Sequence, residues 1–104
     1  MELDDYATWA ARVAEATPMT ARERLAYLAL GLSGEAGEVA DHVKKTLRDG
    51  DAAWNPAKVA EELGDVIFGW AALCAMLGRK PSDILEASRA KIEARIANGR
   101  HSAG

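Results

Sequence analysis

The sequence predicts an all-α fold. Apolar residues recur at helical spacing through most of the 104 residues, capping signals stand at the helix boundaries, and no segment has the alternating, β-branched pattern of a strand. A hydrophobic fraction of 49% in a chain of this length suits one small domain. We therefore expect a single domain over residues 1–104, built from four helices, with a flexible tail over residues 99–104.

The first two helices are separated by the helix-breaking pair Thr17-Pro18. The first helix should run from about residue 3 to residue 16. The second should begin after Thr20, because residues 20–23 read Thr-Ala-Arg-Glu and so have the form of a capping box. It should continue to about residue 48 and end at Asp49-Gly50, where a glycine can close the helix.

Proline marks the beginning of each of the two remaining helices. Asn55-Pro56 supplies a capping side chain and a first-turn proline for a helix that should end near residue 77, before Gly78. Pro81 begins the fourth helix, which should end near residue 98. Because the connection between the second and third helices is short, we expect these two to be antiparallel neighbours.

Each of the two middle helices has an apolar stripe that we expect to form the core. In the second helix the stripe consists of Leu25, Leu28, Leu32, Ala36, Val39, Val43 and Leu47. In the third helix it consists of Val59, Leu63, Val66, Trp70, Leu73 and Leu77.

Acidic residues form an i,i+3 pair beside each stripe. Glu35 and Glu38 lie on the second helix, and Glu62 and Asp65 lie on the third. An i,i+3 spacing places two carboxylates on neighbouring turns of one helix face, where their charges repel unless a cation or protons neutralise them. If the helices fold back on each other, the two pairs would form a cluster of carboxylates, the ligands that Mg²⁺ prefers.

The two acidic pairs also lie at the same depth in the expected hairpin. Glu38 and Asp65 are each roughly 14–15 Å from the turn, at a rise of 1.5 Å per residue. Glycine is frequent around the pairs although it weakens a helix, which indicates room for a ligand or a close approach of helices. The glycines are Gly31, Gly34, Gly37, Gly64 and Gly69.

Charge and composition exclude several functional classes. A net charge of −3 gives no electrostatic basis for general nucleic-acid binding. The single cysteine, Cys74, excludes an internal disulfide and suits a reducing compartment. No apolar run is long enough for a membrane span, and the acidic N-terminus differs from a secretory signal, so we expect a cytoplasmic protein.

The strings Gly34-Glu35-Ala36-Gly37-Glu38-Val39 and Glu61-Glu62-Leu63-Gly64-Asp65-Val66 carry a resemblance to a known family. They resemble the all-α nucleoside triphosphate pyrophosphohydrolases of the MazG-like family, whose acidic signature is Glu-x-x-Glu followed on the next helix by Glu-x-x-Asp. The likeness extends from about residue 25 to residue 95. It implies a four-helix, antiparallel MazG-like bundle completed by dimerisation, as a homodimer or a dimer of dimers.

The resemblance implies hydrolysis of a nucleoside triphosphate between the α- and β-phosphates, giving a monophosphate and pyrophosphate, in nucleotide-pool house-cleaning. Glu35, Glu38, Glu62 and Asp65 would then be ligands of Mg²⁺, for which Mn²⁺ could substitute. Either Glu35 or Glu38 could instead be the base that orients the attacking water, and the sequence leaves this choice open.

Substrate contacts are expected from the last helix and from a tryptophan. The family often has an Asn-x-x-Lys-x-x-x-Arg pattern there, and this chain has Ser88, Lys91 and Arg95 at those positions, so the lysine and arginine match and the serine does not. By resemblance, Lys91 and Arg95 would contact the triphosphate. Trp9 or Trp54 could stack on a nucleobase or could pack in the core or an interface.

Two rival functions remain open at this point. A phosphoribosyl-ATP pyrophosphohydrolase would have a similar length and acidic helical core, although the Gly-Glu-Ala-Gly-Glu-Val string favours the MazG-like branch. A helical interaction module without catalysis would not need four acids at matched depth. His42, four residues after Glu38, could ligate a metal, but the third helix has no histidine to complete a di-iron pattern, so we expect an ordinary partly buried residue.

Overall fold

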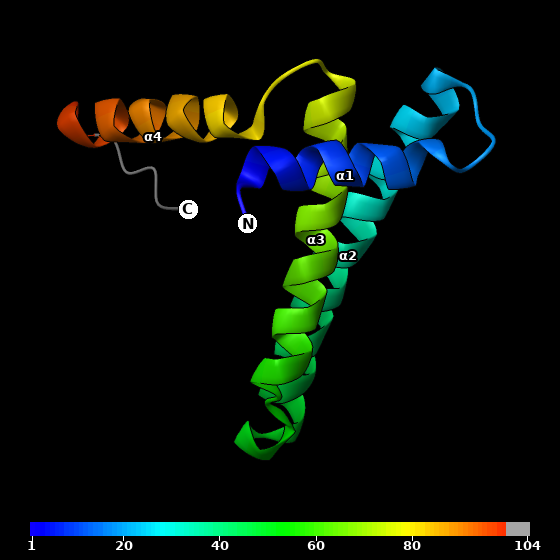
Figure 1. Ribbon diagram of the computed structural model, residues 1–104. Helices are drawn as coiled ribbons and strands as arrows, with labels where there is room; N and C mark the ends of the chain where they lie inside the picture. The colour runs from blue at the N-terminus through cyan, green and yellow to red at the C-terminus, as the bar shows by residue number, and fades with distance from the viewer. Residues whose placement is uncertain (100–104) are drawn as a thin grey trace.

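The computed structural model describes residues 1–99 and confirms the all-α class (Figure 1). The helices are α1 (Leu3–Glu15), α2 (Ala21–Asp49), α3 (Pro56–Met76) and α4 (Pro81–Ala97), with a short 3₁₀ turn, η1 (Asp51–Ala53), between α2 and α3. No strand occurs among residues 1–99, and no helix there has the length and apolarity of a membrane span. The expected helix boundaries agree closely with these. Residues 100–104 of the expected flexible tail lie outside the described residues.

Local hydrogen bonds explain where the middle helices begin and end. Thr20 and Glu23 form the expected capping box, in which the Glu23 amide donates to the Thr20 hydroxyl at 3.1 Å and the Thr20 amide donates to the Glu23 carboxylate at 2.9 Å. The Asn55 side chain accepts from the Lys58 amide at 3.1 Å and caps α3. Gly50 ends α2 with a φ of 98°, a conformation that favours glycine.

The helices form an antiparallel hairpin with two attachments. In Figure 1, α2 and α3 run side by side, and α1 crosses them near the end where α2 begins and α3 ends. The hydrophobic core lies at this crossing and consists of small residues with aromatic neighbours. Its buried members are Ala7, Ala10, Leu28, Ala71 and Ala72. Alanine lets α1 approach the backbone of α3 closely, so the crossing fixes the position of that end of the hairpin.

The expected apolar stripes are not buried along their whole length. Leu47 is 82% exposed and Leu63 is 53% exposed. The prediction of a core position is also wrong for Leu25, Ala36, Val43 and Leu77. Away from α1 the hairpin is only two helices thick, and two helices can bury only a narrow strip between them. One chain therefore leaves a large part of its apolar surface uncovered.

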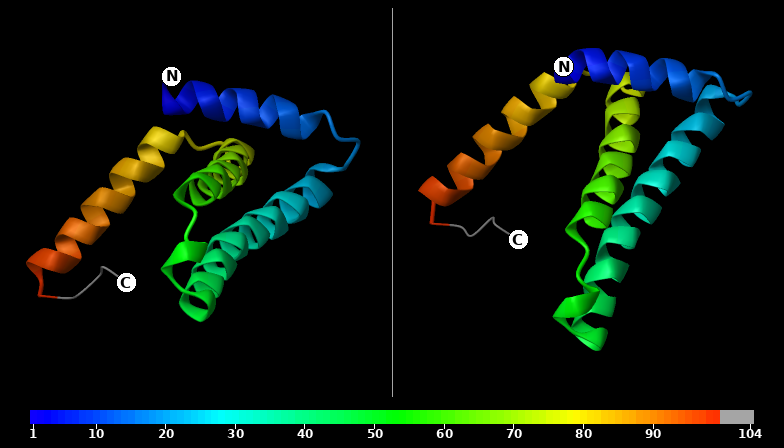
Figure 2. Two further views of the ribbon diagram at one scale, coloured as in Figure 1. Left: turned by 90° about the horizontal axis from the view of Figure 1, so that it is seen from below. Right: turned by 60° about the horizontal axis from the view of Figure 1, so that its bottom comes forward.

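Helix α4 is held at its first turn and then leaves the hairpin (Figure 2). The Asp4 carboxylate of α1 accepts hydrogen bonds from the Ser82 amide at 2.9 Å and the Ser82 hydroxyl at 2.6 Å. The hydrogen bond from the Ser82 side chain, followed by that from its amide, holds the pKa of Asp4 below its ordinary value. Pro81 is the buried residue of α4, while Leu85 and Ile96 are 51% and 64% exposed.

Candidate functional site

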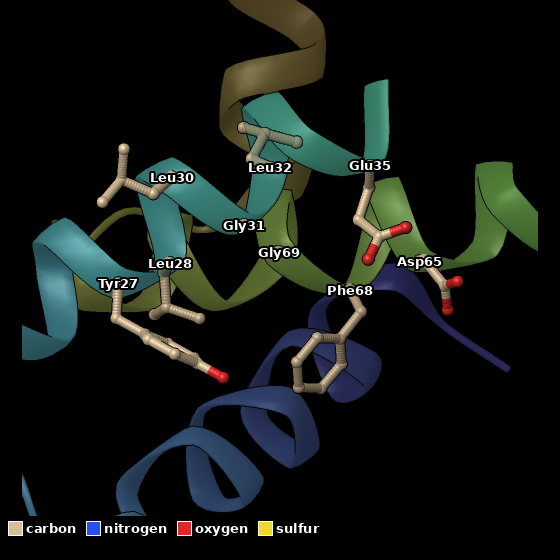
Figure 3. Close-up of a pocket in the computed structure, with 9 residues that line it drawn as sticks. All are labelled: Tyr27, Leu28, Leu30, Gly31, Leu32, Glu35, Asp65, Phe68 and Gly69. Atoms are coloured by element: carbon tan, nitrogen blue, oxygen red, sulfur yellow. The ribbon is translucent and has the colours of Figure 1, made fainter. Parts of the chain in front are cut away.

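Two of the four predicted acids meet at one groove between α2 and α3 (Figure 3). Glu35 of α2 and Asp65 of α3 line a groove of about 510 Å³, a volume within the usual range of small-molecule sites. Figure 3 shows both side chains at the same end of it. The antiparallel hairpin places them there because Gly69 packs against Leu32, and Glu35 and Asp65 each lie one helical turn from that contact, towards the η1 end.

Glu62 is the buried member of the acidic set, with an exposure of only 7%. Its Oε1 lies 3.9 Å from the Lys58 ammonium, a loose ion pair whose lysine is largely exposed. Its Oε2 is buried and has no hydrogen-bond partner within residues 1–99. A buried carboxylate oxygen without a partner is costly unless a cation or a proton compensates it. The chemistry of this donor set, carboxylate oxygens throughout, fits a hard divalent cation such as Mg²⁺.

The four acids do not form a closed cluster in the part of the chain that the structure describes. Glu38 is exposed on the turn after Glu35, and no three acidic, histidine or cysteine side chains among residues 1–99 lie close enough together to hold one ion. The expected cluster of four carboxylates is therefore not present among residues 1–99. Carboxylates of like charge repel at contact distance, so their side chains converge only when positive charge or protons compensate them.

The opposite end of the groove is apolar and aromatic. Tyr27 and Leu28 of α2 line that end, and Phe68 of α3 lies between them and the two acids in Figure 3. Trp9 of α1 packs edge-on against Phe68, with ring centroids 6.0 Å apart, and remains 47% exposed. Trp9 therefore does not line the groove, but it packs against Phe68, which does. Of the two roles expected for this tryptophan, the structure shows packing.

The structure does not bring the predicted cations to the acids. Lys91 and Arg95 are exposed on α4, and Figure 2 shows this helix pointing away from the hairpin that carries the groove. The neighbouring Arg89 donates to Glu93 of its own helix at 2.8 Å. Any contact of Lys91 or Arg95 with a substrate in the groove needs α4 of another chain, or a different position of α4.

The remaining polar candidates have structural roles. His42 Nε2 accepts a hydrogen bond from the Asn55 amide at 3.0 Å, and its ring lies 5.4 Å from that of Trp54. These contacts confirm a partly buried residue that fixes the turn between α2 and α3. Cys74 is buried, and its burial raises the pKa of the thiol, so it is a packing residue.

Sequence reasoning missed Tyr27 and Phe68 as groove residues. A signal was present, because Tyr27, Gly31 and Glu35 are spaced i,i+4 and so share one row of α2, while Phe68 follows Asp65 by one turn of α3. Only the pairing of the two helices shows that both rows face the same groove.

Comparison with known proteins agrees with this geometry. Residues 23–99 match the MazG nucleotide pyrophosphohydrolase domain. The chain belongs to the MazG family. The matched range includes all four acids together with Lys91 and Arg95, whereas Trp9 precedes it. The earlier resemblance to MazG-like pyrophosphohydrolases is thereby confirmed.

A relative of this chain occurs in a bacteriophage. The Gene 37 protein of Mycobacterium phage L5 is 39% identical over 80 residues, which cover 74% of this chain and 70% of the phage protein. Its name says nothing about its activity. No solved structure is significantly similar to this chain.

Proposed function

We propose that this MazG-family protein is an enzyme that hydrolyses a nucleoside triphosphate between the α- and β-phosphates. The products are a nucleoside monophosphate and pyrophosphate, and the role is removal of unwanted nucleotides from the pool. The observation that most supports this is Glu62, whose buried Oε2 has no hydrogen-bond partner in residues 1–99, one helical turn from the groove acid Asp65. Together with family membership, this buried carboxylate indicates a cation-dependent site.

The acids of the hairpin have the ligand role in this proposal. Glu62 and Asp65 on α3, with Glu35 and Glu38 on α2, would hold Mg²⁺, or Mn²⁺ in its place. When bound, the ion would neutralise triphosphate charge and lower the pKa of a water molecule. The chain's own contribution is to fix the acids on two rigid helices, at the end of an apolar groove that can hold the rest of the substrate.

The two candidates for the base differ in position. Glu35 is half-buried and lines the groove, whereas Glu38 is exposed one turn further along α2. A base must lie within hydrogen-bond reach of the water that it orients. Glu35 is therefore the better placed of the two to accept a proton from a water molecule beside a substrate in the groove.

We also propose that two copies of the chain form the active species, as a homodimer or a dimer of dimers. On α4 the cations Lys91 and Arg95 share one side of the helix with exposed apolar residues, while Glu86 and Glu93 lie on the opposite side. The exposed apolar residues of that side are Leu85, Ile92 and Ile96, and Ile84 on the same side is half-buried. A surface that is apolar and basic suits the apolar and acidic surface of an α2–α3 hairpin, and the direction of α4 favours the hairpin of a second copy.

The rival functions are less well supported. A phosphoribosyl-ATP pyrophosphohydrolase would break the same kind of bond, but the chain matches the MazG domain over residues 23–99. A purely structural helical module has no use for a buried carboxylate without a partner. We further propose that residues 1–104 act as one domain and that the enzyme works in the cytoplasm, where nucleoside triphosphates are found.

The bond that breaks is tested directly by product analysis in ¹⁸O-labelled water. Purified protein with Mg²⁺ and a panel of nucleoside triphosphates should give monophosphate and pyrophosphate in equal amounts, with the label on the monophosphate. Glu35→Gln and Glu38→Gln, measured in parallel, should separate the roles of these two acids. Nucleoside diphosphate and orthophosphate as the primary products would reject the proposal.

A further inference from the structure

Gly31 occupies an unusual position in the wall of the groove. Tyr27, Gly31 and Glu35 are spaced four residues apart on α2, and all three line the groove. Figure 3 shows Gly31 on the helix between the other two. A side chain at position 31 would therefore lie in the groove, between the Tyr27 ring and the Glu35 carboxylate.

Packing within the chain does not require this glycine. A Cβ atom built on Gly31 would meet nothing within 4 Å in the part of the chain that the structure describes. Gly69, on the facing helix, is different, because its Cβ would lie 3.6 Å from Leu32, so it allows close approach of α2 and α3. Since glycine destabilises a helix interior relative to alanine, Gly31 lowers the stability of α2 without improving its packing.

Both walls of the groove have the same order of chemistry. On α2, Glu35 lies about 12 Å along the helix axis from Tyr27, with Gly31 midway. On α3, Asp65 is followed by Phe68, one turn further from the η1 end of the hairpin. The groove therefore has an acidic end and an aromatic end, and the floor at Leu28, Leu32 and Gly69 joins them.

We propose that Gly31 determines which nucleosides the groove accepts. This inference rests on the proposed function, since a triphosphate held at the acidic end directs the nucleoside along the groove towards Tyr27 and Phe68. The gap at Gly31 admits the nucleoside, and the two aromatic side chains contact the base. Tyr27 is 60% exposed, which leaves its ring free to contact a ligand.

A nucleoside explains the groove better than a second copy of the chain does. The acidic end of the groove is continuous with its apolar part, because Glu35 and Asp65 line the same space as the apolar residues. An apolar segment of another chain would bury these carboxylates without a partner, which is costly. The proposed docking of a second copy's α4 would instead place Lys91 and Arg95 at the acidic end and leave the gap at Gly31 open for the nucleoside. A nucleotide brings its phosphates, with their cations, to that end.

The test is to fill the gap. Gly31→Ala and Gly31→Val add one and three carbon atoms to the groove wall, and both residues are better helix formers than glycine. Gly34→Ala is the matched control, because Gly34 lies on the same helix, its Cβ would also meet nothing within 4 Å among residues 1–99, and it does not line the groove. All three variants should melt at or above the temperature of the wild-type protein.

Nucleoside binding should separate the variants. In fluorescence titrations with adenosine, guanosine, cytidine and uridine, Gly31→Val should raise the Kd about tenfold or more, and purines should lose more than pyrimidines. Gly31→Ala should raise the Kd less, again more for purines than for pyrimidines, and Gly34→Ala should leave the Kd unchanged. With nucleoside triphosphates, KM should follow the same pattern while kcat changes little.

The outcomes distinguish this inference from the proposed function. If the wild-type protein releases pyrophosphate but the Gly31 variants keep its Kd and KM values, the role of Gly31 is rejected and the proposed reaction stands. If no triphosphate is hydrolysed, the reaction fails, and loss of nucleoside binding on filling the gap still supports the groove assignment. A change in sedimentation of Gly31→Val, with nucleoside binding unaltered, would show that a second copy occupies the groove and would overturn the inference.

Discussion

The α2–α3 hairpin and helix α4 both have charged residues at helical spacing, but they position these residues very differently. In the hairpin, packing between two antiparallel helices brings Glu35 and Asp65 to one groove and buries Glu62. On α4, Lys91 and Arg95 lie on a helix that contacts the rest of the chain mainly through its first turn. The same spacing on a helix therefore produces a site in one region and an exposed surface in the other.

The difference shows what a helix needs in order to direct its side chains. A repeat of three or four residues determines only which side chains share a face. A second packed element must then hold that face against another surface, and α4 has such an element mainly near its beginning, where Ser82 donates hydrogen bonds to Asp4 of α1. We expect the acids of the hairpin to act within one chain and the cations of α4 to depend on a second.

The largest expected effect is that of Glu62→Gln in the hairpin. Loss of a residue that only orients a metal ligand already costs about 10- to 100-fold, so loss of a direct ligand should reduce kcat/KM more than about 100-fold. The variant should melt at or above the wild-type temperature without Mg²⁺, because a buried neutral amide is less costly than a buried charge. Steady-state pyrophosphate release measures the loss of kcat/KM, and thermal melting without Mg²⁺ measures the stability.

The control for this change is Glu61→Gln, which removes the same charge from the neighbouring exposed residue. It should keep its activity, and Mg²⁺ should raise its melting temperature as in the wild type, because the ion binds the folded state. Unchanged activity in Glu62→Gln would contradict the metal role of this residue.

Next in size should be the effect of Ile92→Asp on association through α4. Burial of an isoleucine contributes about 1.5–3 kcal/mol, and a dimer with two-fold symmetry contains the change twice. The dimer dissociation constant should rise about 100-fold or more, measured by sedimentation velocity over a range of concentrations. Ala90→Asp, on the opposite side of α4, should leave association intact; equal effects of the two changes would disprove this docking surface.

Lys91→Ala should have a more moderate effect. A charge-assisted hydrogen bond contributes about 1.5–3 kcal/mol, so the affinity for triphosphate should fall about tenfold or more, while that for monophosphate changes little. Arg89→Ala is the control, because Arg89 pairs with Glu93 on its own helix. Isothermal titration with a non-hydrolysable triphosphate checks this, and a loss of equal size for monophosphate would exclude a role at the distal phosphates.

A mixing experiment then tests which chain supplies the cations. The double variant Lys91→Ala/Arg95→Ala and the variant Glu62→Gln are each expected to be impaired alone. If α4 reaches the groove of a second copy, mixed dimers contain one intact site, and activity returns on mixing. No recovery, under conditions where subunits exchange, would show that acids and cations act within the same chain.

The smallest expected effect is at the attachment of α4. Because hydrogen bonds from Ser82 lower the pKa of Asp4, the ionised carboxylate stabilises the folded state at pH values above its ordinary pKa of 3.8, and this contribution is lost as the pH falls through the lowered value. Asp4→Asn should therefore reduce the melting temperature by a few degrees or less at pH 7. The difference should shrink below about pH 3.8. Melting curves that differ equally at pH 7 and at pH 3 would contradict it.

The sequence by itself determined the helices and the acidic pairs that the two middle helices carry. Thr20 with Glu23, and Asn55 with Pro56, gave the beginnings of α2 and α3 because capping is a local interaction between residues three apart. The i,i+3 spacing of the acidic pairs likewise follows from the helical repeat. These features depend on neighbours in sequence and could be predicted without the fold.

Only the tertiary structure decided which faces are buried and which side chains meet. Leu47 and Leu63, one from each expected core stripe, are exposed, since a hairpin of two helices has too little surface to cover both stripes along their whole length. Glu62 is buried, Phe68 and Tyr27 share a groove with the acids, and α4 points away from them. These outcomes depend on contacts between residues far apart in sequence, and helical periodicity contains no information on the partner that a face will find.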